Sequence, residues 1–225
     1  FIGNQWVKPS TLKVFEIINA STGERIATVP EGFEADIDAA VAAARTAFDK
    51  SGWPQLSPVE RAKVMLKFME AMAKRGSQLA QAVSMQNGMP VSLSNMLEAQ
   101  FPAGLLQYYA SLADGLSLSE SRPSQMGKET LVEKSAIGVV GAIVPWNFPA
   151  TLAFSKIAPA MLAGCTLVIK PSPGTVLDSY LVAEAALEAG VPAGVINIVA
   201  ADRAAGAHLV SHPDIDKIAF TGSTA

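Results

Sequence analysis

The chain has 225 residues, half of them hydrophobic, which is enough to bury one large core with an appendage. Its 17 Lys and Arg residues against 20 Asp and Glu give a net charge of −3, and no basic run favours a nucleic-acid partner. Its apolar stretches are shorter than the roughly 20 residues of a spanning helix, so no membrane segment is expected. A single cysteine and the lack of a secretory leader favour a cytoplasmic location.

The N-terminal half predicts short strands followed by helices. Residues 1–32 alternate apolar residues with turn formers, which is typical of short strands or extended surface segments. Apolar residues then recur at intervals of three and four over 35–48 and 58–75, a helical pattern. Two more helices are expected, at 77–86 and as one longer helix at 91–113.

The C-terminal half begins with a polar segment, 118–136, which predicts an arm or hairpin outside the core. Short apolar strands then alternate with helices. Strands are expected at 138–144, 166–170, 195–199 and 216–220, and helices at 151–163, 176–189 and 203–211. This alternation predicts an α/β fold whose parallel sheet is covered by helices on both faces. Because ligands of such sheets bind at the carboxyl ends of the strands, the loops after these strands are the candidate site.

Two polar residues follow strands at this edge. Asn147 is a neutral donor between Trp146 and Phe148, whose rings could exclude water, and an amide there suits a developing oxyanion. Asn is also a preferred N-cap residue, and position alone favours capping. Lys170 ends an apolar strand and either binds a nucleotide ribose or phosphate or is simply solvated. The glycine turn at 220–224 suits a phosphate because free N–H groups point outward from it.

The order and spacing of these segments resemble the aldehyde dehydrogenase superfamily. The motifs that carry the resemblance are GVVGAIVPWNFP at 138–149, KIAPAMLAGCTLVIKPSPGT at 156–175, GVPAGVINIV at 190–199 and IAFTGST at 218–224. N-terminal segments such as FIGNQWV and QNGMPVSLSN agree, so the resemblance covers essentially the whole chain. It implies a Rossmann-like NAD(P)-binding domain over 1–117 and 137–225, with an N-terminal helical segment, and an oligomerisation arm at 118–136.

The resemblance also implies a reaction. Family members oxidise an aldehyde to a carboxylic acid with NAD(P), through a cysteine thiohemiacetal and a thioester that a glutamate helps to hydrolyse. Both residues follow the glycine turn in the family, so the catalytic domain is expected to lie outside this chain. The chain is then a fragment, inactive alone, of a homodimer or homotetramer. Cys165, which precedes the apolar strand TLVIK, is expected to be a buried structural residue rather than the nucleophile.

The resemblance assigns roles by position, and for Asn147 it favours the oxyanion hole over the cap. The implied cofactor-binding residues are Ile143, Trp146, Lys170, Ser172, Gly222 and Ser223, and the implied substrate-tunnel residues are Phe148, Leu152 and Ser155. Lys156 matches a lysine near the active site. Pro173 stands where many NAD-preferring members carry a glutamate that binds the ribose, so NADP stays open as the cofactor although NAD is favoured.

Other interpretations remain open. The chain could be a truncated, non-catalytic nucleotide-binding or assembly module, or its family machinery could act on acyl groups or semialdehydes. Leu152 and Ser155 are not aromatic and indicate a tunnel opening that is not crowded by rings, which suits a medium or bulky aldehyde. His208 and His212 lie four residues apart, but Pro213 ends the helix and the sequence offers no further ligand cluster, so no metal site is expected.

Overall fold

A four-stranded parallel sheet forms the centre of the computed structural model, which describes residues 1–223. Its strands are β5 (Val139–Ile143), β6 (Thr166–Lys170), β7 (Ile196–Ile198) and β8 (Lys217–Phe220). Their spatial order is β7-β6-β5-β8. From β5 the chain adds β6 and then β7 on one side, and β8 then pairs with the other edge of β5. The predicted α/β fold with a parallel sheet is confirmed.

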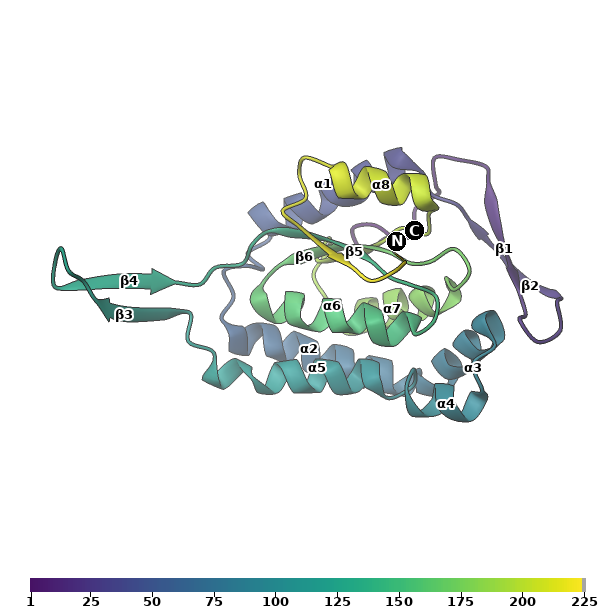
Figure 1. Ribbon diagram of the computed structural model, residues 1–225, viewed down its shortest axis with the longest axis horizontal. Helices are drawn as coiled ribbons and strands as arrows, with labels where there is room; N and C mark the ends of the chain where they lie inside the picture. The colour runs from purple at the N-terminus through teal and green to yellow at the C-terminus, as the bar shows by residue number, and fades with distance from the viewer. Residues whose placement is uncertain (224–225) are drawn as a thin grey trace.

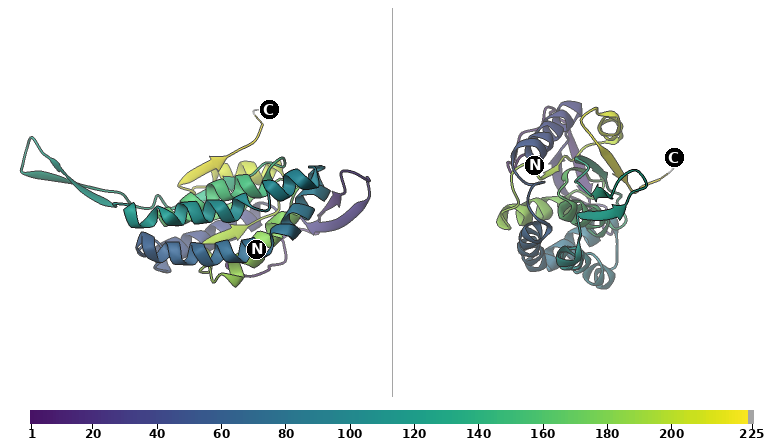
Figure 2. Two further views of the ribbon diagram at one scale, coloured as in Figure 1. Left: turned by 90° about the horizontal axis from the view of Figure 1, so that it is seen from below. Right: turned by 90° about the vertical axis from the view of Figure 1, so that its left-hand side faces the viewer.

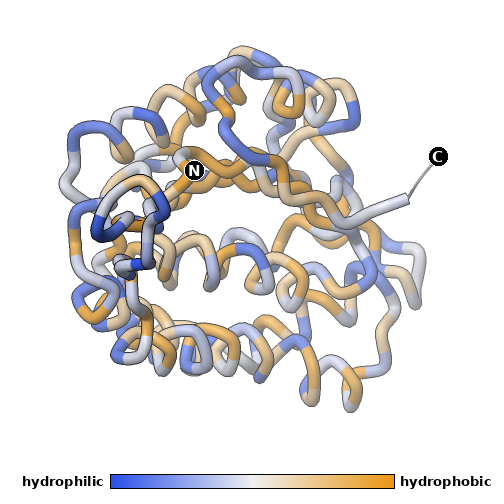
Figure 3. The backbone as a smooth tube through the Cα atoms, turned by 60° about the vertical axis from the view of Figure 1, so that its left-hand side comes forward, coloured by the Kyte–Doolittle hydropathy of each residue, from blue (hydrophilic) through white to orange (hydrophobic). Residues whose placement is uncertain are grey.

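Helices cover both faces of the sheet. α6 (Pro149–Ala163) and α7 (Leu177–Glu188) lie on one face, and α1 (Glu34–Lys50) and α8 (Arg203–Ser211) lie on the other (Figure 1). Strand residues alternate between the two cores: Val140 packs with the α6 side, whereas Val139 packs with the α1 and α8 side. Most strand residues are therefore apolar, and the tube at the centre of the molecule is mainly orange in Figure 3.

A further layer of helices packs behind α6 and α7. It consists of α2 (Pro58–Lys74) and α5 (Phe101–Ser111), which lie side by side (Figure 1). The rings of Phe68 and Phe154 join this layer to α6, with centroids 5.4 Å apart. The Arg61 side chain is buried, and its Nε donates to the Leu162 carbonyl over 2.8 Å. The layer thus fixes the C-terminal end of α6.

The expectation of one helix over 91–113 is wrong. Between α3 (Gly76–Asn87) and α5 lies the short α4 (Val91–Met96), and residues 97–100 form a turn. Pro102 lies in the first turn of α5 and has no N–H, so it cannot donate to the carbonyl of residue 98 and continue α4. The break leaves Glu98 outside both helices, and its buried side chain is then free to contact α6.

Two antiparallel hairpins lie outside the central sheet. β3 (Ser119–Pro123) pairs with β4 (Glu129–Glu133), and this largely exposed hairpin projects from the body in both Figure 1 and Figure 2. β1 (Val14–Ile18) pairs with β2 (Arg25–Pro30) at the opposite end (Figure 1). A single 3₁₀ turn, η1 (Ala113–Gly115), precedes β3. Among residues 1–223, no helix has the length and apolar character needed to cross a membrane.

Gly194, in the turn before β7, is held against α1. Its φ is +80°, and a Cβ at this position would lie 2.5 Å from the Ala43 carbonyl oxygen. We expect Gly194→Ala to lower the free energy of unfolding by about 2–3 kcal/mol, because backbone strain adds to a clash that backbone atoms cannot relieve. Gly190→Ala is the matched control, since Gly190 has φ +70° but no atom within 4 Å of the added Cβ. Equal losses for both variants in urea denaturation would contradict the clash.

Candidate functional site

A cleft of about 850 Å³ opens at the carboxyl ends of β5, β6 and β8. It lies where the strand order reverses between β5 and β8, the place at which open α/β sheets bind ligands. Seven residues singled out in the sequence line it: Ile143, Trp146, Asn147, Lys170, Ser172, Gly222 and Ser223. The structure therefore brings together every predicted cofactor-binding residue and the candidate oxyanion donor.

Lys170 is not the solvated lysine that its strand-end position allowed. It is 6% exposed, and its Nζ donates to the carbonyl oxygens of Pro171 and Ala201, each over 3.0 Å. Burial lowers the pKa of Lys170 to about 8, although the nearby Asp202 carboxylate acts in the opposite direction. Gly206 on α8 makes room for the side chain, since a Cβ there would lie 3.1 Å from Lys170 Cε. The ammonium is thus held in place at the cleft wall.

Asn147 does not cap α6, so the capping interpretation is wrong. The N-cap residue of α6 is Phe148, whose side chain makes no capping hydrogen bond. The acceptor is instead Glu98, whose Oε2 accepts from the backbone N–H groups of Ala150 (2.8 Å) and Thr151 (3.3 Å). The Asn147 amide is exposed and lines the cleft. Trp146 is 59% exposed, so its ring does not shield the amide within the described chain.

Glu98 was missed by sequence reasoning. Its side chain is fully buried, and burial raises the pKa of its carboxyl, while the hydrogen bonds from Thr151 and Ala150 partly offset the shift. A carboxylate at a helix N-terminus is favoured by the free N–H groups and the helix dipole. No local sequence pattern predicts this contact, because Glu98 and Ala150 are 52 positions apart in the chain.

Asn87, the last residue of α3, holds the Asn147 loop from the other side. Its Nδ2 donates to the carbonyl oxygens of Trp146 (3.1 Å) and Asn147 (3.2 Å). Its Oδ1 accepts from the N–H of Met89 over 3.0 Å, which fixes the orientation of the amide. Two side chains from the α3–α4 region, Asn87 and Glu98, therefore fix the backbone on either side of the candidate oxyanion donor.

The predicted substrate-tunnel residues lie at the N-cap and in the N-terminal half of α6, and none of them lines the cleft. Phe148, Leu152 and Ser155 are spaced by four and three residues, which places them on one side of the helix. Lys156 joins α6 to the turn after β8: its Nζ donates to Thr221 Oγ1 over 2.7 Å. Partial burial lowers the pKa of Lys156. This lysine therefore braces the cleft at the end of β8.

A buried acid lies near the start of α7. Gln86 on α3 accepts, through Oε1, from the N–H groups of Val176 and Leu177, each over 2.8 Å. Asp178 in the first turn of α7 is buried, and burial raises the pKa of its carboxyl to about 7, with a smaller raising contribution from the Glu98 charge. α7 follows the loop that carries Ser172, which lines the cleft.

Asp178 should make stability depend on pH. Between the ordinary pKa of 3.8 and about 7, the unfolded chain has released this proton while the folded protein keeps it. The free energy of unfolding should therefore fall as pH rises through this window, by at most about 1.4 kcal/mol per pH unit from this group. We expect Asp178→Asn to remove that slope, measured by urea denaturation between pH 5 and 7.5. The exposed Asp114→Asn is the control, and an unchanged slope in Asp178→Asn would contradict the assignment.

Cys165 lies between α6 and β6 and is buried, 3% exposed. Its carbonyl oxygen accepts a hydrogen bond from Trp53 Nε1 over 3.0 Å. A buried thiol in an apolar core is a packing residue, as the sequence predicted.

Comparison with known proteins identifies the class that this fold and cleft define. The model of the aldehyde dehydrogenase family matches residues 6–225. The geranial dehydrogenase of Castellaniella defragrans is 54% identical over 225 residues, which are all of this chain and 47% of that protein. A family 2 member C4 aldehyde dehydrogenase of Arabidopsis thaliana is 43% identical, with 100% of this chain and 45% of that protein covered.

Solved structures agree. The NAD+ complex of an aldehyde dehydrogenase from Bacillus cereus has a TM-score of 0.95 at 36% identity and covers 100% of this chain and 46% of its own. The NAD+ complex of the Mycobacterium tuberculosis aldehyde dehydrogenase has a TM-score of 0.92 at 41% identity, and the match covers 97% of this chain and 45% of that one. The chain belongs to the aldehyde dehydrogenase family, has the fold of its NAD-binding domain, and spans about half the length of the relatives it matches.

Proposed function

We propose that this chain is the cofactor-binding part of an enzyme that oxidises an aldehyde to a carboxylic acid with NAD+. The observation that carries the proposal is the convergence of Lys170, Ser172, Trp146 and Gly222 on one cleft, with the Asn147 amide exposed in the same wall. In this proposal the Asn147 amide stabilises the negative charge that develops on the aldehyde oxygen when the cysteine attacks the aldehyde carbon, while the cysteine nucleophile and glutamate base belong to the other half of the enzyme.

The cleft residues fit a dinucleotide. Lys170 is a buried donor, and in the described contacts its ammonium donates to two carbonyl oxygens. A ribose hydroxyl of a bound dinucleotide could replace one of these carbonyl oxygens as the acceptor. The peptide N–H groups around Gly222 lie at the end of β8 and suit a phosphate. Bound NAD+ supplies the hydride acceptor, and the residues of this chain hold and orient it.

Cofactor choice depends on the loop after β6. Pro173 lines the cleft beside Lys170 and Ser172, and the exposed Arg203 lines it from α8. The cationic side chains of Lys170 and Arg203, with no carboxylate at position 173, are compatible with a ribose 2′-phosphate, so the proposal includes NADP+ as an alternative cofactor. NAD+ is favoured because the structural neighbours at TM-scores of 0.95 and 0.92 were solved with it.

A binding experiment tests the cofactor site. We expect Lys170→Met to weaken NAD+ and NADP+ together, because it removes the buried donor that both would share. We expect Pro173→Glu to weaken NADP+ by about tenfold or more while sparing NAD+, because a carboxylate there repels a 2′-phosphate. Quenching of tryptophan fluorescence on titration with each dinucleotide gives both dissociation constants. Unchanged NAD+ binding in Lys170→Met would remove Lys170 from the cofactor site.

Activity tests the reaction. The full-length protein should form NADH, measured by absorbance, when an aldehyde and NAD+ are supplied together. We propose a medium or bulky aldehyde as substrate, which is supported by Leu152 and Ser155 on α6 and by the geranial dehydrogenase relative at 54% identity. Oxidation confined to the smallest aldehydes would contradict the substrate class. Dinucleotide binding with no oxidation of any aldehyde by the full-length protein would favour the non-catalytic module.

We also propose that the β3–β4 hairpin is an oligomerisation arm of a homodimer or homotetramer. The support is its geometry: nearly all of its residues are exposed, including Leu131, which is 63% exposed, and it stands away from the body (Figure 2). Residues 1–117 and 137–225 then form the NAD(P)-binding domain. Light scattering on the full-length protein and on a Leu131→Asp variant measures the mass, and an unchanged oligomer in the variant would count against the arm.

A further inference from the structure

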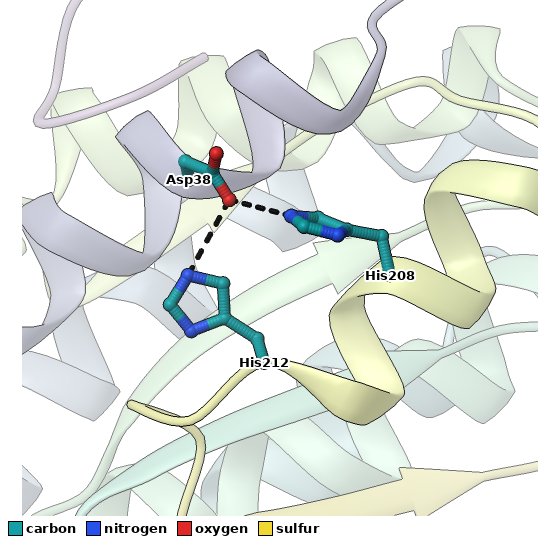
Figure 4. A group of neighbouring side chains, drawn as sticks. All are labelled: Asp38, His208 and His212. Carbon is teal, nitrogen blue, oxygen red and sulfur yellow. Dashed lines mark hydrogen bonds and ion pairs between the residues drawn. The ribbon is translucent and has the colours of Figure 1, made fainter.

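Three candidate metal ligands, Asp38, His208 and His212, meet between α1 and the C-terminal end of α8 (Figure 4), and none of them lines the cleft. His208 Nε2 lies 2.6 Å from Asp38 Oδ1, and His212 Nε2 lies 3.4 Å from the same oxygen. The ligand atoms of all three residues lie within 4.8 Å of one another. The sequence showed the two histidines but no further ligand, because Asp38 on α1 is 170 residues away from His208.

The donor set suits one class of ion. Two imidazoles and a carboxylate are typical zinc ligands, and zinc sites with three protein ligands keep a water in the fourth position. At zinc bond lengths of about 2.0–2.2 Å, tetrahedral ligand atoms lie roughly 3.4 Å apart. The His212–Asp38 separation of 3.4 Å already meets this spacing, and His208 must retreat from Asp38 by less than 1 Å.

The surroundings leave room for the ion and its water. The Asp38 side chain is 55% exposed, while the His212 side chain is 11% exposed. Arg45 lies two turns after Asp38 on α1, and its guanidinium is paired with Asp216 rather than with Asp38. One bond must change: His212 Nδ1 accepts from the Asp214 N–H over 3.1 Å, and binding through Nε2 places the ring proton on Nδ1. The loss of this hydrogen bond should make the site weaker than a preformed structural zinc site.

We propose that Asp38, His208 and His212 bind one divalent transition-metal ion of the zinc type. The ion would join α1 to α8, the helix whose residues Gly206, Ala207 and Val210 line the cleft. A metal at this position therefore fixes one wall of the cleft from outside. The proposal does not depend on the proposed aldehyde oxidation.

Equilibrium dialysis of the full-length protein against zinc tests the site. We expect a His208→Gln, His212→Gln double variant to bind one zinc ion fewer per chain than the parent. Asp38→Asn should weaken that site at least tenfold, because it removes the negative charge. Asp49→Asn, which changes an exposed carboxylate on the same helix, and Cys165→Ala, which removes the buried thiol, are the matched controls and should leave the stoichiometry unchanged.

A melting experiment checks that the ion acts between the two helices. Zinc should raise the melting temperature of the parent, because it binds the folded state, and this rise should be smaller in the double variant. Magnesium should have no such effect, since it prefers oxygen ligands. Equal zinc stoichiometry in the parent and the double variant would overturn the proposal and leave His208 as a hydrogen-bond partner of Asp38 only.

Discussion

Replacing Asn147 with alanine should lower the turnover of the full-length protein in the proposed aldehyde oxidation by about 10²–10³-fold, a loss of about 2.7–4 kcal/mol of transition-state stabilisation. The amide is exposed in the cleft wall, and its loop is fixed by Asn87 on one side and by α6 on the other. A donor held in place before the reaction stabilises an oxyanion without a cost of reorganisation. The measurement is kcat under conditions in which chemistry is rate-limiting.

The Asn147→Ala variant should keep its fold and its affinity for the dinucleotide, because Glu98 rather than Asn147 caps α6. Asn147→Gln is the matched variant, since it retains the amide but displaces it by one methylene, and we expect an intermediate loss. Unchanged kcat in Asn147→Ala would remove this residue from the mechanism. A loss of stability equal to the loss of activity would mean that Asn147 has a structural role.

Replacing Glu98 with alanine should lower the free energy of unfolding by about 2–4 kcal/mol. The change leaves the N–H groups of Ala150 and Thr151 without their acceptor at the buried start of α6, and each unsatisfied buried group costs about 1–3 kcal/mol. Thr151 is partly exposed, so water replaces part of its bond. Urea denaturation at pH 7 measures the loss.

Glu98→Gln separates the acceptor from the charge. Its amide oxygen can still accept from α6, and burial already raises the pKa of the native carboxyl, so we expect a change of only about 1 kcal/mol or less. If Glu98 also positions the Asn147 loop, Glu98→Ala should lower kcat more than it raises KM, and Glu98→Gln should restore most of kcat. Equal destabilisation by both substitutions would show that the hydrogen bonds to Ala150 and Thr151 are not the source of the effect.

The part of the cleft formed by strand ends and the loops after them was predictable from the βαβ pattern, whereas the lining that α8 contributes was not predicted. Ile143 ends β5, Lys170 ends β6 and Gly222 follows β8, and parallel strands end at one edge of a sheet. The buried partners were not predictable. Glu98 was assigned to the middle of a continuous helix over 91–113, and only the turn at 97–100 turns its carboxylate toward α6. Tertiary packing overrode the helical pattern there.

The sequence by itself determined the element types, because the period of apolar residues changes between the helices and the buried strands. It also determined the loops in which the candidate site residues lie. Only the tertiary structure decided the strand order β7-β6-β5-β8, which places the reversal, and hence the cleft, between β5 and β8. It alone brought Asp38 to His208 and Glu98 to Ala150. Periodicity reports which side of an element is buried, whereas contacts between residues 52 or 170 positions apart depend on how the elements pack.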